Sequence, residues 1–324
     1  MRKLLYTILI GIVGIGIAAP VHALTVSPAR VEITGDPGTT LQGEISLFNE
    51  QEGARTFFTS FENFEPSGDS GAPHFIGAKN GLATWIRADS RVILESGQRA
   101  TVPFSITIPK NAEPGGHFAA VFFGSQAPGT QGGGEVSIGG KIGVLVLLRV
   151  SGEVAEGGGL LEFTTKEKQR FFSALPIAFA YRINNTGGDR VVPRGEIKIK
   201  NTLQITSAKL LANEKEGSVL PSSARKFEVF WGEEPLSDES EKIGFFGMAL
   251  KELREFHFGW YTAKLDLVWG DDASQTAHST YNFFVVPWQL LTIIILVIGI
   301  LGIAGKIVLK KYNRFIIAQA MRNK

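Results

Sequence analysis

The sequence predicts an all-β protein with two β-sandwich domains in tandem and one C-terminal transmembrane helix. Short strand-like segments alternate with turn sequences from residue 24 to 286, and several of them recur in the second half. An uncharged apolar run, residues 283–305, follows the last strand. The expected order is a signal peptide (1–23), a first domain (24–154), a second domain (155–286), a membrane helix (287–309) and a basic tail (310–324).

The N-terminus has the pattern of a secretory signal peptide. Arg2 and Lys3 precede an apolar run, and the small residues Val21 and Ala23 follow it. This pattern predicts cleavage between Ala23 and Leu24. The alternative is an uncleaved N-terminal anchor, because the apolar run is slightly long.

The first half reads as strands separated by Gly, Pro and Asp turns. The expected strands are residues 24–33, 40–49, 55–64, 85–94, 99–108, 118–124 and 141–150. In the fifth of these, Val102, Phe104 and Ile106 alternate with polar residues, as in a half-buried strand. Strands with turns every 8–12 residues are typical of an immunoglobulin-like β-sandwich.

The second half repeats this order loosely. A strand that ends in Asn occurs in both halves, at residues 45–49 and 179–185. An aromatic strand after a glycine also occurs twice, at 116–124 and 259–270. The repeat predicts a second immunoglobulin-like sandwich in series with the first.

Residues 239–255 depart from the strand pattern. Ile243, Phe246, Leu250 and Leu253 stand near helical spacing, with Lys and Glu residues between them. We expect a short amphipathic helix or an ordered loop here. Packing on the sandwich is the default role of its apolar face, and docking of a partner is the alternative.

The C-terminal apolar run is long enough to cross a bilayer. Pro287 stands where a helix can begin, and Trp288 lies near the outer interface. Lys306 can snorkel to the far interface, and only basic charges follow it. The positive-inside rule therefore predicts a single-pass protein of the cell membrane, with a cytoplasmic C-terminus and residues 24–286 outside.

Charge and composition exclude several function classes. The two ends hold eight of the 33 basic residues and none of the 31 acidic ones, so the exported part has a net charge of −6. Nucleic acid is therefore not expected as a partner. Cysteine is absent, histidines are isolated, and no nucleophile or metalloprotease motif occurs. We expect no enzyme activity, no metal and no cofactor.

The remaining class of function is the binding of a ligand or partner by the protein surface. Trp85, Trp231 and Trp260 are the candidate binding residues, because exposed aromatic rings stack on sugars and anchor protein interfaces. The more common role of strand tryptophans is to fill sandwich cores. An exposed sheet edge is a second possible surface.

Several segments carry a family resemblance. They are LTVSPARVEI at residue 24, GEISLFNEQEG at 43, the lone Trp85, and SGQRATVPFSITIPKNAEPGGHFAAVFFG at 96. Together with the domain order, they resemble the WxL-interacting type of bacterial cell-surface protein.

That resemblance implies a non-catalytic surface adaptor. Its first domain would bind peptidoglycan or another envelope glycan, and the protein would assemble with surface proteins of the WxL type. The rival hypothesis is a chaperone-like assembly factor that offers a sheet edge to exported proteins.

Overall fold

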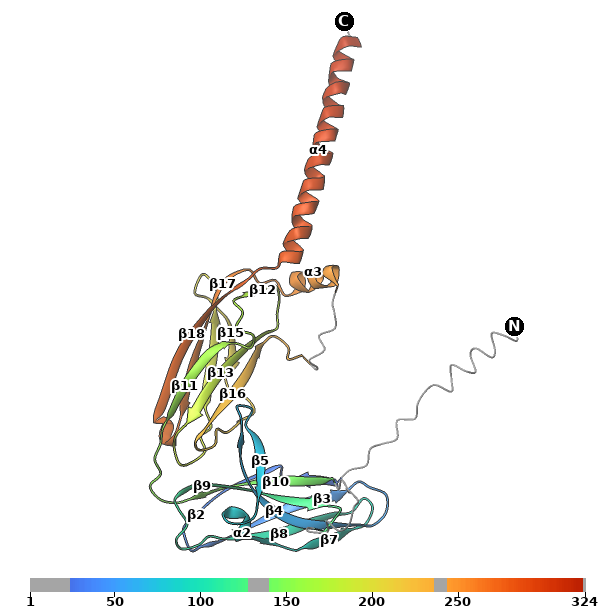
Figure 1. Ribbon diagram of the computed structural model, residues 1–324. Coiled ribbons are helices and arrows are strands. Elements are labelled where there is room, and N and C mark those ends of the chain that lie inside the picture. The colour runs from blue at the N-terminus through green and yellow to red at the C-terminus, as the bar shows by residue number, and fades with distance from the viewer. Residues whose placement is uncertain (1–23, 128–139, 236–243, 323–324) are drawn as a thin grey trace, which may run out of the picture. The chain divides into compact units, whose positions relative to one another are not determined.

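The computed structural model describes residues 24–127, 140–235 and 244–322, and it confirms an all-β chain with one long apolar C-terminal helix (Figure 1). The predicted signal peptide up to Ala23 and part of the 239–255 segment lie outside these residues. The chain divides into two compact units. Unit 1 contains residues up to Glu65 and His74–Glu153, and unit 2 contains Pro66–Pro73 and the chain from Val154 onward.

Unit 1 is a sandwich of two sheets. The four-stranded sheet has the order β1 (Leu24–Ser27), β3 (Thr40–Asn49), β8 (Arg99–Thr107), β6 (Ile86–Ala88). The six-stranded sheet has the order β2 (Arg30–Gly35), β10 (Lys141–Val150), β9 (Gly115–Gly124), β4 (Arg55–Ser67), β5 (Ala72–Gly77), with β7 (Arg91–Leu94) also paired to β4. The pairings of β1–β3, β3–β8, β6–β8, β9–β10, β4–β9 and β4–β7 are antiparallel, and that of β2 with β10 is parallel.

The core of unit 1 lies between these sheets. The alternation that the sequence shows in β8 places Val102, Phe104 and Ile106 in the core. They meet residues of the other sheet such as Val121 and Val146. Burial of apolar side chains from both sheets stabilises the sandwich, at roughly 1.5–3 kcal/mol for each fully buried large side chain.

Two expected strands of unit 1 differ in the structure. The segment 24–33 divides at Pro28 into β1 and β2, which lie in opposite sheets. Proline has no N–H for a ladder, and this favours a strand break there. The segment 85–94 becomes the end of a short helix, α2 (Leu82–Trp85), followed by β6 and β7. Gly81, whose φ is 68°, begins that helix.

Unit 2 is the second sandwich. Its three-stranded sheet has the order β11 (Gly158–Thr165), β13 (Ile177–Asn185), β16 (Ser223–Trp231). Its five-stranded sheet has the order β12 (Phe171–Phe172), β18 (Gln275–Val285), β17 (Gly259–Trp269), β14 (Arg194–Lys200), β15 (Thr206–Leu211), and a 3₁₀ turn (Asp271–Ala273) joins β17 to β18. The distribution of strands over the two sheets is immunoglobulin-like.

The core of unit 2 is aromatic. Phe179 and Tyr181 from β13 meet Tyr261 from β17 and Phe283 from β18. The rings of Tyr261 and Phe283 stack with 5.7 Å between their centroids. Buried aromatic side chains of this size contribute much of the stability of a sandwich.

Two helices complete unit 2. Helix α3 (Phe245–Arg254) lies within the segment expected to be helical, and α4 (Trp288–Arg322) begins three residues after β18 ends. The two helices pack against each other at the first turns of α4. The stretch Trp288–Ile317 of α4 is long and apolar enough to cross a membrane. Its most apolar part is not covered by the rest of the protein.

Candidate binding surfaces

Trp85 ends helix α2 on unit 1, and a buried asparagine fixes that helix. Asn63 Oδ1 accepts a hydrogen bond from the Ala83 N–H at 2.9 Å, and Asn63 Nδ2 donates to the carbonyl oxygens of Gly77 and Asn80. The Trp85 ring is half-buried, and its centroid lies 4.8 Å from that of His117. Trp85 packs in part against the core of unit 1 and is only partly exposed, so its contact with a ligand would be limited to the exposed part of the side chain.

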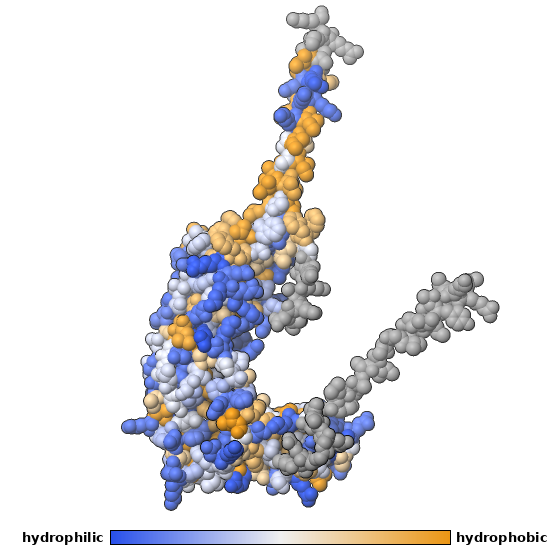
Figure 2. Space-filling view, in the orientation of Figure 1, coloured by the Kyte–Doolittle hydropathy of each residue, from blue (hydrophilic) through white to orange (hydrophobic). Residues whose placement is uncertain are grey.

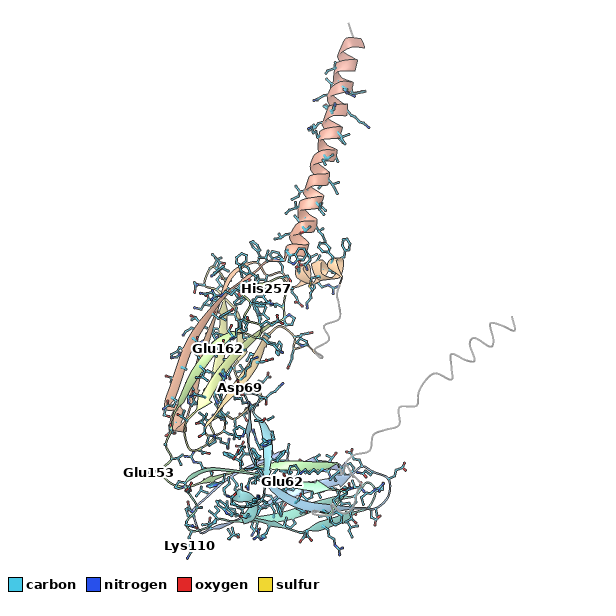
Figure 3. All side chains as sticks on the ribbon, viewed as in Figure 1. Glu62, Asp69, Lys110, Glu153, Glu162 and His257 are labelled. Carbon is cyan, nitrogen blue, oxygen red and sulfur yellow. The ribbon has the colours of Figure 1, made fainter. Side chains whose placement is uncertain are left out.

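The outward face of the six-stranded sheet carries a second aromatic group. The Phe75 ring lies 6.1 Å from Phe64 and 4.8 Å from Phe122, and Phe64 also contacts Phe118. Lys141 Nζ lies 4.1 Å from the centre of the Phe122 ring and is paired with Glu62, which Figure 3 labels. Phe64 and Phe122 are buried, so the cluster is mainly packing on this face of the sheet, and only Phe75, Phe118 and the ion pair reach the surface of unit 1.

Trp231 and Trp260 have opposite environments in unit 2. Trp231 is 5% exposed and packs against His257 and Tyr261, so it belongs to the core and offers no ring face to a ligand. Trp260 is 50% exposed and contacts Phe284 at 5.6 Å. Trp85 lies on the other unit. The three candidate tryptophans therefore do not form one surface within either unit.

Charged residues on unit 2 pair along one strand and across to the next. Asp266 on β17 accepts a hydrogen bond from His278 Nδ1 on β18 at 2.6 Å and pairs with Lys264 at 3.0 Å. Partial burial raises the pKa of Asp266, but the hydrogen bonds from Lys264 and His278 outweigh this effect and hold the pKa below its usual value. Pairs of this kind on an open sheet face are structural, and they contribute about 0–1 kcal/mol each.

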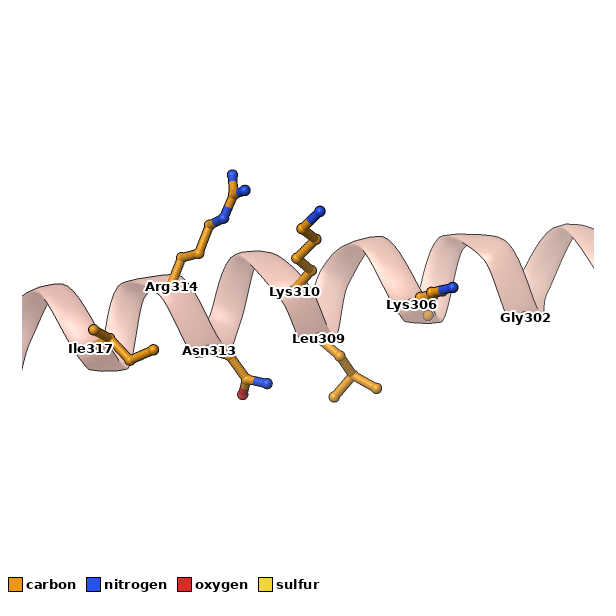
Figure 4. Close-up of a pocket in the computed structure, with 8 residues that line it drawn as sticks. Gly302, Lys306, Leu309, Lys310, Asn313, Arg314 and Ile317 are labelled. Atoms are coloured by element: carbon orange, nitrogen blue, oxygen red, sulfur yellow. The ribbon is translucent and has the colours of Figure 1, made fainter.

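Other site types find little support in the described part of the chain. No group of three or more His, Asp or Glu residues there is arranged to hold a metal ion. A hollow lined by Lys306, Lys310, Asn313 and Arg314 runs along the flank of α4, and among the described residues α4 alone forms it (Figure 4). Three of these four side chains are basic, and all of them project from a single helix.

In the described part of the chain, no run of exposed apolar residues marks the edge strands β5, β11 and β15 as an acceptor surface. Strands β5, β11 and β15 end their sheets and carry the exposed apolar residues Ile76, Leu161 and Leu211, one on each strand. Single exposed apolar residues are normal on protein surfaces. They do not favour the chaperone-like alternative over any other role.

The structure joins Trp260 and the apolar face of α3, which the sequence treated separately, into one surface with residues that the sequence patterns did not identify. Exposed aromatic and aliphatic residues gather at the end of unit 2 where α4 begins, and Figure 2 shows this end in orange. Figure 3 labels His257 at the same end. The closely spaced Phe256, Phe258 and Trp260 were the available signal in the sequence, but strand alternation assigns such residues to a core as readily as to a surface.

No protein-family model matches the sequence, and no curated protein is significantly similar to it. Among solved structures, the class 5 fimbriae chaperone CfaA is similar over 80% of this chain and 98% of its own, with 12% identity and a TM-score of 0.38. The E. coli chaperone DraB is similar over 81% of this chain and 97% of its own, with 9% identity and a TM-score of 0.32.

A chain in the complex of the Salmonella enterica SafA pilin with the SafB chaperone is also similar. It matches over 83% of this chain and 99% of its own, with 11% identity and a TM-score of 0.35. Values this low transfer no function to the present chain.

Proposed function

We propose that this chain is a non-catalytic adaptor of the bacterial cell envelope, anchored in the cell membrane by α4. One observation carries the proposal: β18 ends at Val285, and the apolar helix begins at Trp288. The connection leaves little slack, so α4 would hold unit 2 at the membrane surface. Two β-sandwiches on such an anchor suit a role in display and binding, where tethering raises the effective concentration of partners.

The charges at the end of α4 give the expected orientation. Basic residues begin at Lys306, continue through Lys310, Lys311 and Arg314, and are accompanied by no acidic residue. By the positive-inside rule this end lies in the cytoplasm and both sandwiches lie outside.

We assign the ligand of unit 1 to peptidoglycan or another envelope glycan. Trp85 supports this assignment, because it is partly exposed at the end of α2, and its ring lies next to that of His117. Unit 2 would then face protein partners, for which surface proteins of the WxL type are the expected class.

Single cysteines test the membrane orientation, since the chain contains none of its own. Lys110→Cys on unit 1 should react with a membrane-impermeant maleimide in intact cells. Asn313→Cys on α4 should react only after permeabilisation. Labelling of both positions in intact cells, or of Asn313→Cys alone, would overturn the proposed anchoring.

Co-sedimentation of the detergent-solubilised full chain with purified peptidoglycan tests the ligand. Trp85→Ala should weaken binding about 3- to 10-fold, the equivalent of one aromatic contact of ~1 kcal/mol. Trp260→Ala is the matched control and should bind as the unaltered chain does. Absence of sedimentation for the unaltered chain would remove peptidoglycan as the ligand.

A further inference from the structure

Helix α3 exposes its apolar face, whereas an ordinary surface helix buries it. Phe246, Leu250 and Leu253 form one stripe at i, i+4 and i+7, and all three are exposed, Phe246 by 77%. The residues buried against the protein are Ala249 and Glu252. A surface helix of a globular protein normally turns its apolar stripe inward. The default expectation for residues 239–255, packing of this stripe on the sandwich, is therefore wrong.

A buried carboxylate holds α3 in this orientation. Glu252 is 1% exposed, and its Oε2 accepts a hydrogen bond from the Leu290 N–H, in the first turn of α4, at 2.7 Å. The free N–H groups and the dipole at a helix N-terminus both favour a carboxylate there. On the neighbouring turn, the Phe245 ring lies 5.7 Å from Trp288. Both contacts turn the apolar stripe outward beside the beginning of the apolar helix.

The chain after α3 continues the exposed apolar surface. Phe256, Phe258 and Trp260 are each at least half exposed. Phe258 and Trp260 both contact Phe284, near the end of the strand that leads into α4, at 6.1 and 5.6 Å. Phe171 reaches the same Phe284 ring at 6.3 Å and is also exposed.

The turn between β14 and β15 joins this surface. Thr202 Oγ1 accepts a hydrogen bond from the Trp260 N–H at 3.1 Å and donates to the Trp260 carbonyl oxygen at 3.0 Å. Leu203 and Ile205, on either side of the tip of this turn, are exposed. We call the exposed stripe of α3, the aromatic residues of 256–260, Phe171 and the Leu203–Ile205 turn the apolar collar.

We propose that the apolar collar is a membrane-contact surface: α3 lies in the interface of the bilayer, and the aromatic side chains of the collar insert among the lipid headgroups and upper acyl chains. This inference rests on the proposed anchoring by α4. It adds that unit 2 rests on the membrane through a defined face and is not merely tethered to it.

The position of the collar along α4 favours lipid as the occupant. The first turns of α4 are covered, with Gln289 and Leu290 both buried, and full exposure begins at Ile294. The fully exposed apolar part, from Ile294 to Leu309, is ~24 Å long at about 1.5 Å per residue, and it fits within the ~30 Å of bilayer hydrocarbon if Lys306 snorkels to the far interface. A helix of this length that spans the bilayer places the covered turns, and α3 beside them, at the outer interface.

The chemistry of the collar also fits this depth. Aromatic side chains are enriched at the membrane interface, and amphipathic helices lie there with their apolar face toward the acyl chains. Basic side chains border the collar, with Lys251 and Arg254 in the last turn of α3 and Arg170 beside Phe171. Basic groups at this level attract anionic lipid headgroups.

Single cysteines carrying an environment-sensitive fluorophore test the proposal in the full chain, reconstituted into vesicles of phosphatidylcholine and phosphatidylglycerol. Phe246→Cys, Leu250→Cys and Leu253→Cys place the label on the stripe of α3. Lys215→Cys, an exposed position between β15 and β16, is the aqueous control, and Ile298→Cys on α4 is the membrane control. Lipids with a nitroxide high or low on the acyl chain report the depth of each label.

The three α3 labels should shift to shorter emission wavelengths and be quenched most strongly by the shallow nitroxide. Ile298→Cys should be quenched most strongly by the deep nitroxide, and Lys215→Cys by neither. Quenching at Ile298→Cys without quenching on α3 would overturn the membrane-contact surface and leave the anchoring intact. No quenching at Ile298→Cys would overturn the anchoring itself. Labels on α3 that are shielded from aqueous iodide but not quenched by lipid would show that the stripe packs on protein, either this chain or a second copy of it, and would also overturn the proposal.

Discussion

Two buried asparagines give the loose sequence repeat a physical meaning. Asn49 is the last residue of β3, and its Nδ2 donates to the carbonyl oxygens of Gly53, Leu94 and Glu95 at 3.1 Å. Asn185 is the last residue of β13, and its Nδ2 donates to Asp189 and Val219 at 2.7 and 3.0 Å. The two asparagines stand at the ends of corresponding strands, one in each sandwich, and each pairs with nearby backbone carbonyl groups. A smaller apolar residue would leave these carbonyl groups without a hydrogen-bond donor.

Replacement of either asparagine should destabilise its own unit. We expect Asn49→Ala and Asn185→Ala each to lower the free energy of unfolding of that unit by about 2–4 kcal/mol, because several buried hydrogen bonds are lost together. Hydrogen-exchange mass spectrometry of the full chain in detergent reports each unit separately. The exposed Asn282→Ala is the control, with an expected change of less than about 0.5 kcal/mol. Equal loss of protection in both units would contradict the prediction.

Tyr181 should make unit 2 sensitive to alkali. Burial raises the pKa of its hydroxyl well above the usual value, although Arg225 acts in the opposite direction. The hydroxyl donates to the Ala212 carbonyl oxygen at 3.0 Å, and the ring stacks on Phe227. The folded unit therefore keeps this proton at a pH where the unfolded chain, with a pKa of about 10, releases it.

The contribution of protonated Tyr181 to the free energy of unfolding is fully present below about pH 10 and is lost as the pH rises above it. Urea unfolding of the full chain between pH 8 and pH 11 should show this loss. Tyr181→Phe should lower the free energy of unfolding by about 1 kcal/mol at pH 8. Above pH 10, the free energy of unfolding of this variant should fall less steeply with pH. An equally steep dependence in the Tyr181→Phe variant would assign the alkaline loss to other groups.

At the level of elements, the contact between α3 and α4 depends on Glu252. The Leu290 N–H needs an acceptor because no residue of α4 precedes it by four positions. The carboxylate supplies that acceptor and thereby fixes which face of α3 is exposed.

Glu252→Gln should keep α3 docked, because an amide oxygen also accepts the hydrogen bond. Glu252→Ala should free α3 and raise hydrogen exchange over residues 245–254 and at Leu290, while the sandwich strands stay protected. Lys251→Ala, at the position before Glu252, is the control. It shows whether an alanine substitution on α3 raises exchange without loss of the carboxylate. Unchanged protection in Glu252→Ala would show that Phe245 and Trp288 hold the helix without the carboxylate.

At the level of the whole molecule, the two sandwiches hold their cores independently of the C-terminal helix. Neither described core cluster includes a residue after Val285. The fragment 24–286 should therefore keep both β-sandwiches, while α3 loses its partner at Leu290. Far-ultraviolet circular dichroism should show β structure, and hydrogen exchange should show an unprotected α3. A fragment without a β signature would make α4 part of the fold.

The sequence by itself determined the architecture. Alternating apolar residues, turn sequences and an uncharged C-terminal run are local properties, and each predicts its element without knowledge of the others. For the same reason β3 and β10 were predicted to the residue. Only the tertiary structure decided what each apolar residue faces. It placed Trp231 in the core and Trp260 at the surface, divided residues 24–33 between two sheets, and turned the stripe of α3 outward. Periodicity shows that a side of an element is apolar, whereas the packing of distant segments, here Glu252 against Leu290, decides whether that side is covered.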